Sequence, residues 1–297
     1  MFRRALGALR ALRYTSATAG TASSTIFGSI SIADIVASLE RDGLFAGIRL
    51  PRYFVTDLRE FARRTPCFGN INRKISFFPS DHRAAESEFA TPILVGHYLE
   101  KIKDCPRVRE IQEDPVLVET ASRYLKRKPN IISTRMWWSF PVDCVDDSLL
   151  RLVSQNRPHF DLHDWSSVKF FFYLTNVSAD TGPHVYVRKS HRIRRLRDQF
   201  TIFAGKPLSK VVDFYGIGNF VTVCGPAGFG FAEDPFGFHM GTVAKKGPRL
   251  ILEIEYGLSH TTPRQYVGGP AEAHAASKLR PERAPRTLSR CSEAHCA

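Results

Sequence analysis

The residues best suited to chemistry lie at the start of an apolar, aromatic segment, residues 157–177. His159 and Asp161 stand two positions apart, and in extended backbone such residues point to the same side. They can therefore present an imidazole and a carboxylate together, two of the three ligands of the 2-His-1-carboxylate triad that holds non-heme Fe(II). The pair alone proves little, because 10 His and 29 Asp and Glu in 297 residues allow such a pair by chance.

A second segment, residues 233–257, can complete this ligand set. His239 precedes a Lys-Lys-Gly-Pro turn, and Arg249 follows the turn at the start of an apolar run. Turn residues between apolar runs predict a hairpin, in which residues 239 and 249 would lie side by side, about 5 Å apart. A third ligand beside a guanidinium suits iron chelated by 2-oxoglutarate, because the far carboxylate of the keto acid needs a cation.

Three motifs together resemble the phytanoyl-CoA dioxygenase family of Fe(II)/2-oxoglutarate oxygenases. They are HFDLHDWSSVKFFFYLTNV, TGPHVYVRKSHR and GFHMGTVAKKGPRLILEIEYG. The resemblance covers roughly residues 130–258 and is weaker upstream. The chain departs from the family pattern at Arg188-Lys189, where Pro-Gly usually precedes Ser-His, and at His163, where an acidic residue is usual.

The resemblance implies iron on His159, Asp161 and His239, which would be the catalytic residues, and the carboxylate of 2-oxoglutarate on Arg249. It also implies a double-stranded β-helix, a cupin-like jelly roll. The expected activity is hydroxylation of a small organic substrate with O₂, while 2-oxoglutarate is decarboxylated to succinate.

Other residues near these motifs are candidates for polar or substrate contacts. Lys169 shares the phase of His159 and Asp161 and is expected to contact the co-substrate or substrate. His163 and Trp165 follow the ligands directly and are candidates for the substrate mouth, although core packing is the favoured alternative for Trp165.

Two charged groups need an explanation of their own. Glu253 has the phase of Arg249, and a carboxylate inside a barrel needs a cation such as Lys169 or Arg135. The basic run at residues 188–197 is either a clamp for a phosphate or carboxylate of the substrate or a solvated loop.

The elements that must position these residues form a mainly β chain with helices at its N-terminal end. Helices are predicted over residues 31–43, from Thr56 onward, and over residues 114–128. From Asn130 onward, short strands separated by Gly and Pro predict a barrel or jelly roll. Residues 66–92 lack a clean period and are predicted to be a loop, either a lid or a plain connection.

The chain is expected to contain one domain with two basic extensions. Residues 1–30 are predicted to be disordered or targeting sequence, residues 31–260 a single oxygenase domain, and residues 261–297 a disordered tail. Within the domain, residues 31–128 form the helical part and residues 130–258 the β-helix core.

Composition narrows the class of function. The net charge is +13, but residues 1–33 hold four Arg and no acid, and residues 261–297 hold six Lys or Arg against three Glu. Much of the excess therefore lies in the tails, which disfavours nucleic-acid binding and only slightly favours an anionic small molecule. No apolar run is long enough to span a membrane.

The six Cys form no CxxC pair, which indicates a reducing compartment and disfavours zinc. An intracellular, cytoplasmic location is expected, with mitochondria as the alternative because of the Arg-rich start. The competing hypothesis is a catalytically silent jelly-roll binding or scaffold protein, and a nucleic-acid-binding protein is the third.

Overall fold

The structure is a computed structural model that describes residues 26–142, 149–150, 157–162, 164–194 and 205–259. The predictions for the N-terminal extension before residue 26 and for the tail after residue 259 lie outside the described residues, as does His163. No helix of the described part is long and apolar enough to cross a lipid bilayer.

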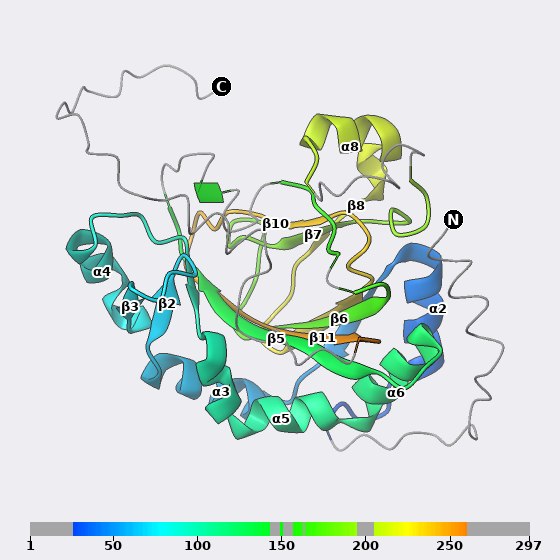
Figure 1. Ribbon diagram of the computed structural model, residues 1–297, viewed down its shortest axis with the longest axis horizontal. Helices are drawn as coiled ribbons and strands as arrows, with labels where there is room; N and C mark the ends of the chain where they lie inside the picture. Colours follow the sequence, from blue (N-terminus) through cyan, green and yellow to red (C-terminus); the bar gives the residue numbers. More distant parts are fainter. Residues whose placement is uncertain (1–25, 143–148, 151–156, 163, 195–204, 260–297) are drawn as a thin grey trace.

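Two antiparallel sheets form the centre of the molecule, and Figure 1 shows the smaller one lying over one face of the larger. The larger sheet has eight strands in the order β1-β9-β6-β11-β5-β4-β2-β3, and the smaller has the order β10-β7-β8. The strands of the larger sheet, in that order, are Leu44–Arg49, Phe229–Glu233, Ser167–Tyr173, Arg249–Gly257, Asn130–Ser139, Val95–His97, Cys67–Gly69 and Ser76–Phe77. Those of the smaller sheet are His239–Gly241, His184–Val187 and Phe220–Val223.

Helices cover the face of the larger sheet that is turned away from the smaller one (Figure 1). They are α2 (Ile32–Asp42), α3 (Arg52–Arg64), α5 (Pro106–Glu113) and α6 (Pro115–Leu125). The remaining helices are α4 (His82–Glu88), α8 (Leu208–Tyr215) and the short 3-10 turns Pro79–Asp81, Leu99–Asp104 and Ile217–Asn219. Because most strands follow the helical part, the predicted mainly β fold with N-terminal helices is confirmed.

Capping residues and a proline set the ends of the N-terminal helices. Helix α2 starts after Ser31, whose hydroxyl accepts a hydrogen bond from a backbone N–H of the first turn, and it ends at Gly43 with a φ of 79°. Helix α3 begins at Arg52, earlier than the predicted Thr56, because Pro51 precedes the first turn with a φ already near helical values.

The prediction that residues 66–92 form a loop is wrong. They contain β2, β3 and α4, and the two strands extend the edge of the larger sheet. These strands have three and two residues, which is too short for a period-2 pattern to appear in the sequence.

Side chains along the central strands point alternately toward the helices and toward the smaller sheet. In β11, Leu250, Leu252 and Ile254 pack in the large hydrophobic cluster with the helices. The residues between them face the smaller sheet, where Ile251 joins a second apolar cluster. All nine residues of β11 are buried, so charged residues on its inner face must find partners inside the protein.

Tyr98 provides a test of the helix-to-sheet contact. Its buried hydroxyl donates to the carbonyl of Ala62 in α3 and accepts from Nε1 of Trp138 in β5 at 2.8 Å. Tyr98→Phe leaves both partners without this bond, so the free energy of unfolding should fall by about 1–3 kcal/mol. Urea denaturation measures the change. Tyr53→Phe, at a ring that is 52% exposed, is the matched control and should have little effect.

Candidate metal centre

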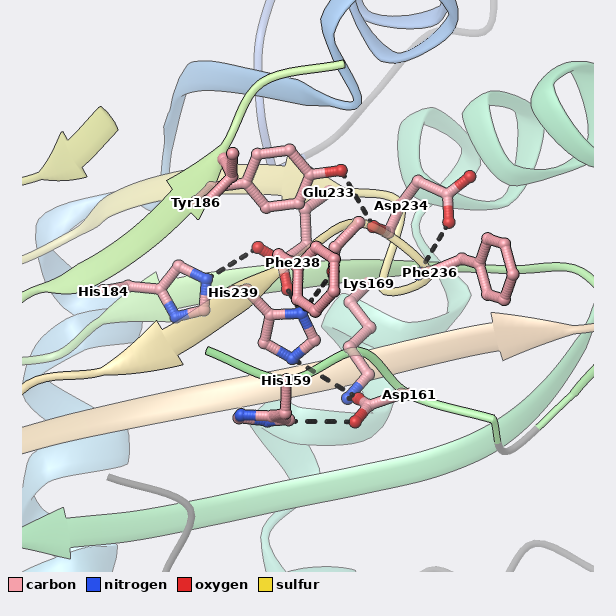
Figure 2. A network of polar contacts seen from close by, with 12 residues as sticks. His159, Asp161, Lys169, His184, Tyr186, Glu233, Asp234, Phe236, Phe238 and His239 are labelled. Atoms are coloured by element: carbon pink, nitrogen blue, oxygen red, sulfur yellow. Dashed lines mark hydrogen bonds and ion pairs between the residues drawn. The ribbon is translucent and has the colours of Figure 1, made fainter. Parts of the chain in front are cut away.

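The three predicted ligands converge at one point between the two sheets. One ligand atom from each of His159, Asp161 and His239 lies within 4.8 Å of the others. His159 and His239 form an isolated antiparallel bridge, with N–H to carbonyl distances of 2.9 and 2.8 Å. Asp161 donates its own N–H to the carbonyl of Pro235 at 2.8 Å. Backbone pairing therefore brings two distant segments together, and Figure 2 shows the side chains facing one another.

Both imidazoles are oriented with Nε2 toward Asp161. Nδ1 of His159 lies 3.0 Å from the carbonyl of Arg157, and Nδ1 of His239 lies 3.0 Å from the carbonyl of Gly237. A carbonyl only accepts, so each Nδ1 carries a proton, and in a neutral imidazole of this tautomer Nε2 keeps the lone pair that binds a metal. Burial lowers the pKa of His239 to about 4. Its imidazole is then neutral near pH 7, which is the form that binds metals.

The carboxylate of Asp161 is shared between the two imidazoles and a buried lysine. Oδ2 lies 3.6 Å from Nε2 of His239, and Oδ1 lies 4.0 Å from Nε2 of His159. Lys169, which is 1% exposed, places Nζ 2.5 Å from Oδ2. The predicted phase of Lys169 relative to Asp161 is therefore observed, and its ammonium is held by the candidate ligand itself.

The inner face of β11 adds two more carboxylates to this lysine. Nζ of Lys169 lies 3.4 Å from Glu253 and 3.8 Å from Glu255. Burial alone would lower the pKa of Lys169, but Asp161 and these two carboxylates together raise it above its ordinary value. The lysine stays charged in the interior because its counterions surround it.

Arg135 of β5 is the second cation of the network. Nη2 of Arg135 lies 2.8 Å from Oε1 of Glu253, so both cations that the sequence suggested for this glutamate contact it. Burial would raise the pKa of Glu253, but Arg135 and then Lys169 keep it below its ordinary value. The prediction that this inner carboxylate needs a cation is confirmed.

The predicted hairpin between His239 and Arg249 is wrong. Strand β10 belongs to the smaller sheet, where His239 is paired with Tyr186 of β7, whereas β11 lies in the larger sheet and pairs Arg249 with Ser139. The backbone N–H groups of residues 245 and 246 both donate to the carbonyl of Asp180. The turn therefore carries the chain from one sheet to the other. The alternation of apolar residues in the sequence looks the same whether or not the two strands pair with each other.

Arg249 nevertheless points a guanidinium into the protein interior. It is 3% exposed, Nη1 donates to the carbonyl of Gly182, and Nη2 donates to Oγ of Ser139 at 2.9 Å. Among the described residues, its buried Nε has no hydrogen-bond partner. Burial lowers the pKa of Arg249. A buried guanidinium without a carboxylate partner among the described residues fits an anionic ligand group.

His184 and Glu233 form a second buried pair that the sequence did not reveal. Nε2 of His184 lies 2.7 Å from Oε2 of Glu233, and Oε1 of Glu233 lies 3.8 Å from Nδ1 of His239. Burial raises the pKa of Glu233 to about 7. Burial, followed by the charge of Arg249, lowers the pKa of His184 to about 3. The sequence offered one signal for His184, because it is the polar residue of the otherwise apolar strand His-Val-Tyr-Val.

Trp165 does not pack in the core. Its side chain is 68% exposed, and Leu162 nearby is 50% exposed. The core-packing alternative for Trp165 is therefore wrong.

Comparison with known proteins finds no matching family model and no matching curated protein. Solved structures do match. The non-heme α-ketoglutarate-dependent carbocyclase SnoK has 16% identity and a TM-score of 0.53, over 89% of this chain and 97% of its own. The epimerase SnoN, with Fe³⁺, α-ketoglutarate and nogalamycin RO, has 14% identity and a TM-score of 0.52, over 87% and 93%.

A third similar structure is HygX from Streptomyces hygroscopicus with nickel and 2-oxoglutarate bound. It has 13% identity and a TM-score of 0.51, over 79% of this chain and 90% of its own. At such low identities the likeness shows the fold: this chain has the jelly roll that these metal- and 2-oxoglutarate-binding enzymes share.

Lys169→Met tests the buried charge network. The substitution leaves Asp161, Glu253 and Glu255 without the ammonium, so the free energy of unfolding should fall by about 3–5 kcal/mol at pH 8. The loss should be smaller at pH 5. Without the lysine, Glu253 loses one of the two cations that hold its pKa down against burial, so its buried charge costs more at pH 8 than at pH 5.

Urea denaturation of the metal-free protein at both pH values measures this effect. Lys246→Met is the matched control, since its pair with Asp180 is exposed and screened by solvent. An equal response of the two variants would contradict the assigned role of Lys169.

Proposed function

We propose that this protein is an Fe(II)- and 2-oxoglutarate-dependent dioxygenase that hydroxylates a small organic substrate. The observation that carries the proposal is the convergence of two imidazoles and one carboxylate within 4.8 Å, inside a jelly roll. The similar structures of SnoN and HygX contain a metal and 2-oxoglutarate, which supports the same cofactors here.

His159, Asp161 and His239 are the proposed metal ligands. Three ligands on one side of an Fe(II) ion leave positions for 2-oxoglutarate and O₂. The iron, loaded with both, would supply the oxidising power for the substrate, and decarboxylation would convert 2-oxoglutarate to succinate. Because Asp161 fills the third ligand position, no vacancy remains for a halide, which favours hydroxylation over halogenation.

Arg249 is the proposed partner of the far carboxylate of 2-oxoglutarate. Its Nη1 and Nη2 bonds to Gly182 and Ser139 hold the guanidinium plane, while Nε is left to donate. A charge-assisted bond in this buried position is stronger than the same bond in water. The proposed role of Lys169 is to orient the carboxylate of Asp161. It is not proposed as a contact to the co-substrate.

We propose that the substrate approaches the centre from the side of His159, the most solvent-exposed of the three candidate ligands. The side chains of His159 and Asp161 are 20% and 13% exposed, against 6% for His239. Trp165 and His163 follow these ligands in the sequence, and we propose them as contacts to a small-molecule substrate.

One observation favours a second function. Nζ of Lys169 already neutralises Asp161 at 2.5 Å, as a bound cation would. A catalytically silent binding or scaffold protein could keep this fold with the lysine in place of a metal. Anaerobic titration with Fe(II) and 2-oxoglutarate separates the two functions, because only a loaded centre develops a charge-transfer absorption band.

The ligand set predicts the outcome of three substitutions. His159→Ala, Asp161→Ala and His239→Ala should each abolish Fe(II)-dependent formation of succinate from 2-oxoglutarate, because two remaining ligands hold the metal poorly. Asp180→Ala removes an exposed carboxylate and should leave activity intact. Full turnover by Asp161→Ala would refute the hydroxylase assignment.

Arg249→Met tests the co-substrate contact separately from the metal. The apparent KM for 2-oxoglutarate should rise about 30-fold or more, which corresponds to a loss of about 2 kcal/mol for a buried charged hydrogen bond. The affinity for the metal alone should change little. Arg188→Met, at an exposed arginine, is the matched control, and a KM unchanged in both variants would argue against this role of Arg249.

A further inference from the structure

The guanidinium of a half-buried arginine packs on aromatic rings that neighbour the candidate ligands in the sequence. The guanidinium carbon of Arg194 is 3.6 Å from the ring centroid of Phe236, 4.0 Å from that of Phe160 and 5.4 Å from that of Phe238. The ring of Phe160 also meets those of Phe236 and Phe238 edge-on, with centroids 5.6 and 5.5 Å apart. The guanidinium is therefore one member of a tightly packed aromatic group.

The aromatic residues of this group are neighbours of the ligands in the sequence. Phe160 stands between His159 and Asp161, and Phe238 immediately precedes His239. Figure 2 shows Phe238 next to His239, and neighbouring residues of an extended segment point to opposite sides. The rings from the two ligand-bearing segments thus meet on the side of the backbone opposite to the ligands, with Arg194 between them.

Arg194 is itself anchored to the same strands. Its Nε donates to the carbonyl of Ser190 at 3.2 Å. The hydroxyl of Ser190, which is fully buried, accepts from the N–H of Phe238 at 2.7 Å and donates to the carbonyl of Val187 at 2.6 Å. Residues 190–194 therefore connect β7 to the segment that leads into His239.

This group is a separate apolar cluster, distinct from the two larger ones. Its members come from the ligand segments, β7, β8 and α8; they are Phe160, Val187, Val211 and Phe238, with Tyr215, Phe220 and Phe236 partly buried against them. The two ligand segments are joined by the pair of hydrogen bonds between His159 and His239 and the one between Asp161 and Pro235. A segment held by few backbone bonds opens easily, so its side-chain packing decides how well the ligands are preorganised.

We propose that Arg194 is a positioning residue for the metal centre: its guanidinium, stacked between the rings of Phe160 and Phe236, holds the 157–162 and 236–239 segments in register. The inference rests on the proposed function, since it takes the three ligands to bind metal. An arginine suits this role because its flat, weakly hydrated guanidinium stacks on aromatic faces. Within the basic run at residues 188–197, Arg188 and Arg192 are exposed, as a solvated loop predicts, whereas Arg194 packs on aromatic rings.

The first experiment uses the metal-free protein. Hydrogen exchange is followed in peptides that cover residues 157–162 and 236–241, for the wild type, Arg194→Met and Arg194→Lys. Arg194→Met should exchange roughly tenfold faster in both peptides, because the cation–π contacts that restrain them are lost. Peptides from β6 and β11 should be unchanged. Arg194→Lys keeps the charge but lacks the flat guanidinium, so it should restore only part of the protection.

The second experiment titrates each protein with Co²⁺ alone, without 2-oxoglutarate, and follows the visible absorption of the bound ion. Arg194→Met should bind about tenfold more weakly than the wild type, as expected for loss of a group that orients ligands. Arg192→Met is the matched control. This exposed arginine lies two residues away and donates to the carbonyl of Glu40, so its removal should affect neither measurement.

The outcomes separate the two proposals. If the wild type binds no Co²⁺, the proposed function fails and this inference fails with it. If the wild type binds and Arg194→Met matches it in affinity and exchange, only the role of Arg194 is refuted. Should Arg194→Met fail to fold, Phe236→Leu decides, because it removes the nearest ring and keeps an apolar side chain; wild-type affinity in that variant refutes the inference.

Discussion

The arrangement of this protein depends on a single pair of backbone hydrogen bonds, which joins His159 to His239. One partner continues into β10 of the smaller sheet, and the other precedes β6 of the larger sheet. Because neighbouring residues of such a bridge face the same side, the two imidazoles cannot avoid each other once the bonds form. Asp161 points to the same side as His159 because residues two apart in extended backbone share a side. The candidate centre is thus a consequence of how the two sheets meet, and the side chains around it adjust to that contact.

The second constraint is the charge inside the jelly roll. Asp161, Glu233, Glu253 and Glu255 all lie in the interior, and burial makes each of them costly unless a cation or a proton compensates. Lys169 and Arg135 compensate on one side of the candidate ligands, while His184 meets Glu233 on the other. Such a network stabilises little compared with apolar packing of the same volume. Its use here is to fix the orientation of one carboxylate and two imidazoles before any ligand arrives.

The sequence predicted the elements and residues that follow from local periodicity. The shared side of His159, Asp161 and Lys169, the helix ended by Gly43, and the need of Glu253 for a cation all rest on residues close together in the chain or in one strand. The hairpin at residues 239–249 failed because apolar runs around a turn look alike whether the chain returns to the same sheet or crosses to the other. Glu233 and Arg194 were not predicted, since their roles arise only from long-range packing. Phe160 and Phe238, which adjoin the candidate ligands, could have indicated an aromatic site for Arg194. A phenylalanine in an apolar segment is, however, ordinarily assigned to the hydrophobic core.

Strand β6 limits how such a protein can change over evolutionary time. All seven of its residues are buried, with alternate side chains in the helix-side layer and beside the ligands. Deletion of a single residue before Lys169 would exchange the two sides, moving an ammonium into hydrocarbon and a phenylalanine against Asp161. Fold and chemistry would be lost in the same event. New substrate preferences must therefore arise in the segments outside this strand, where length can vary without reversing the sheet.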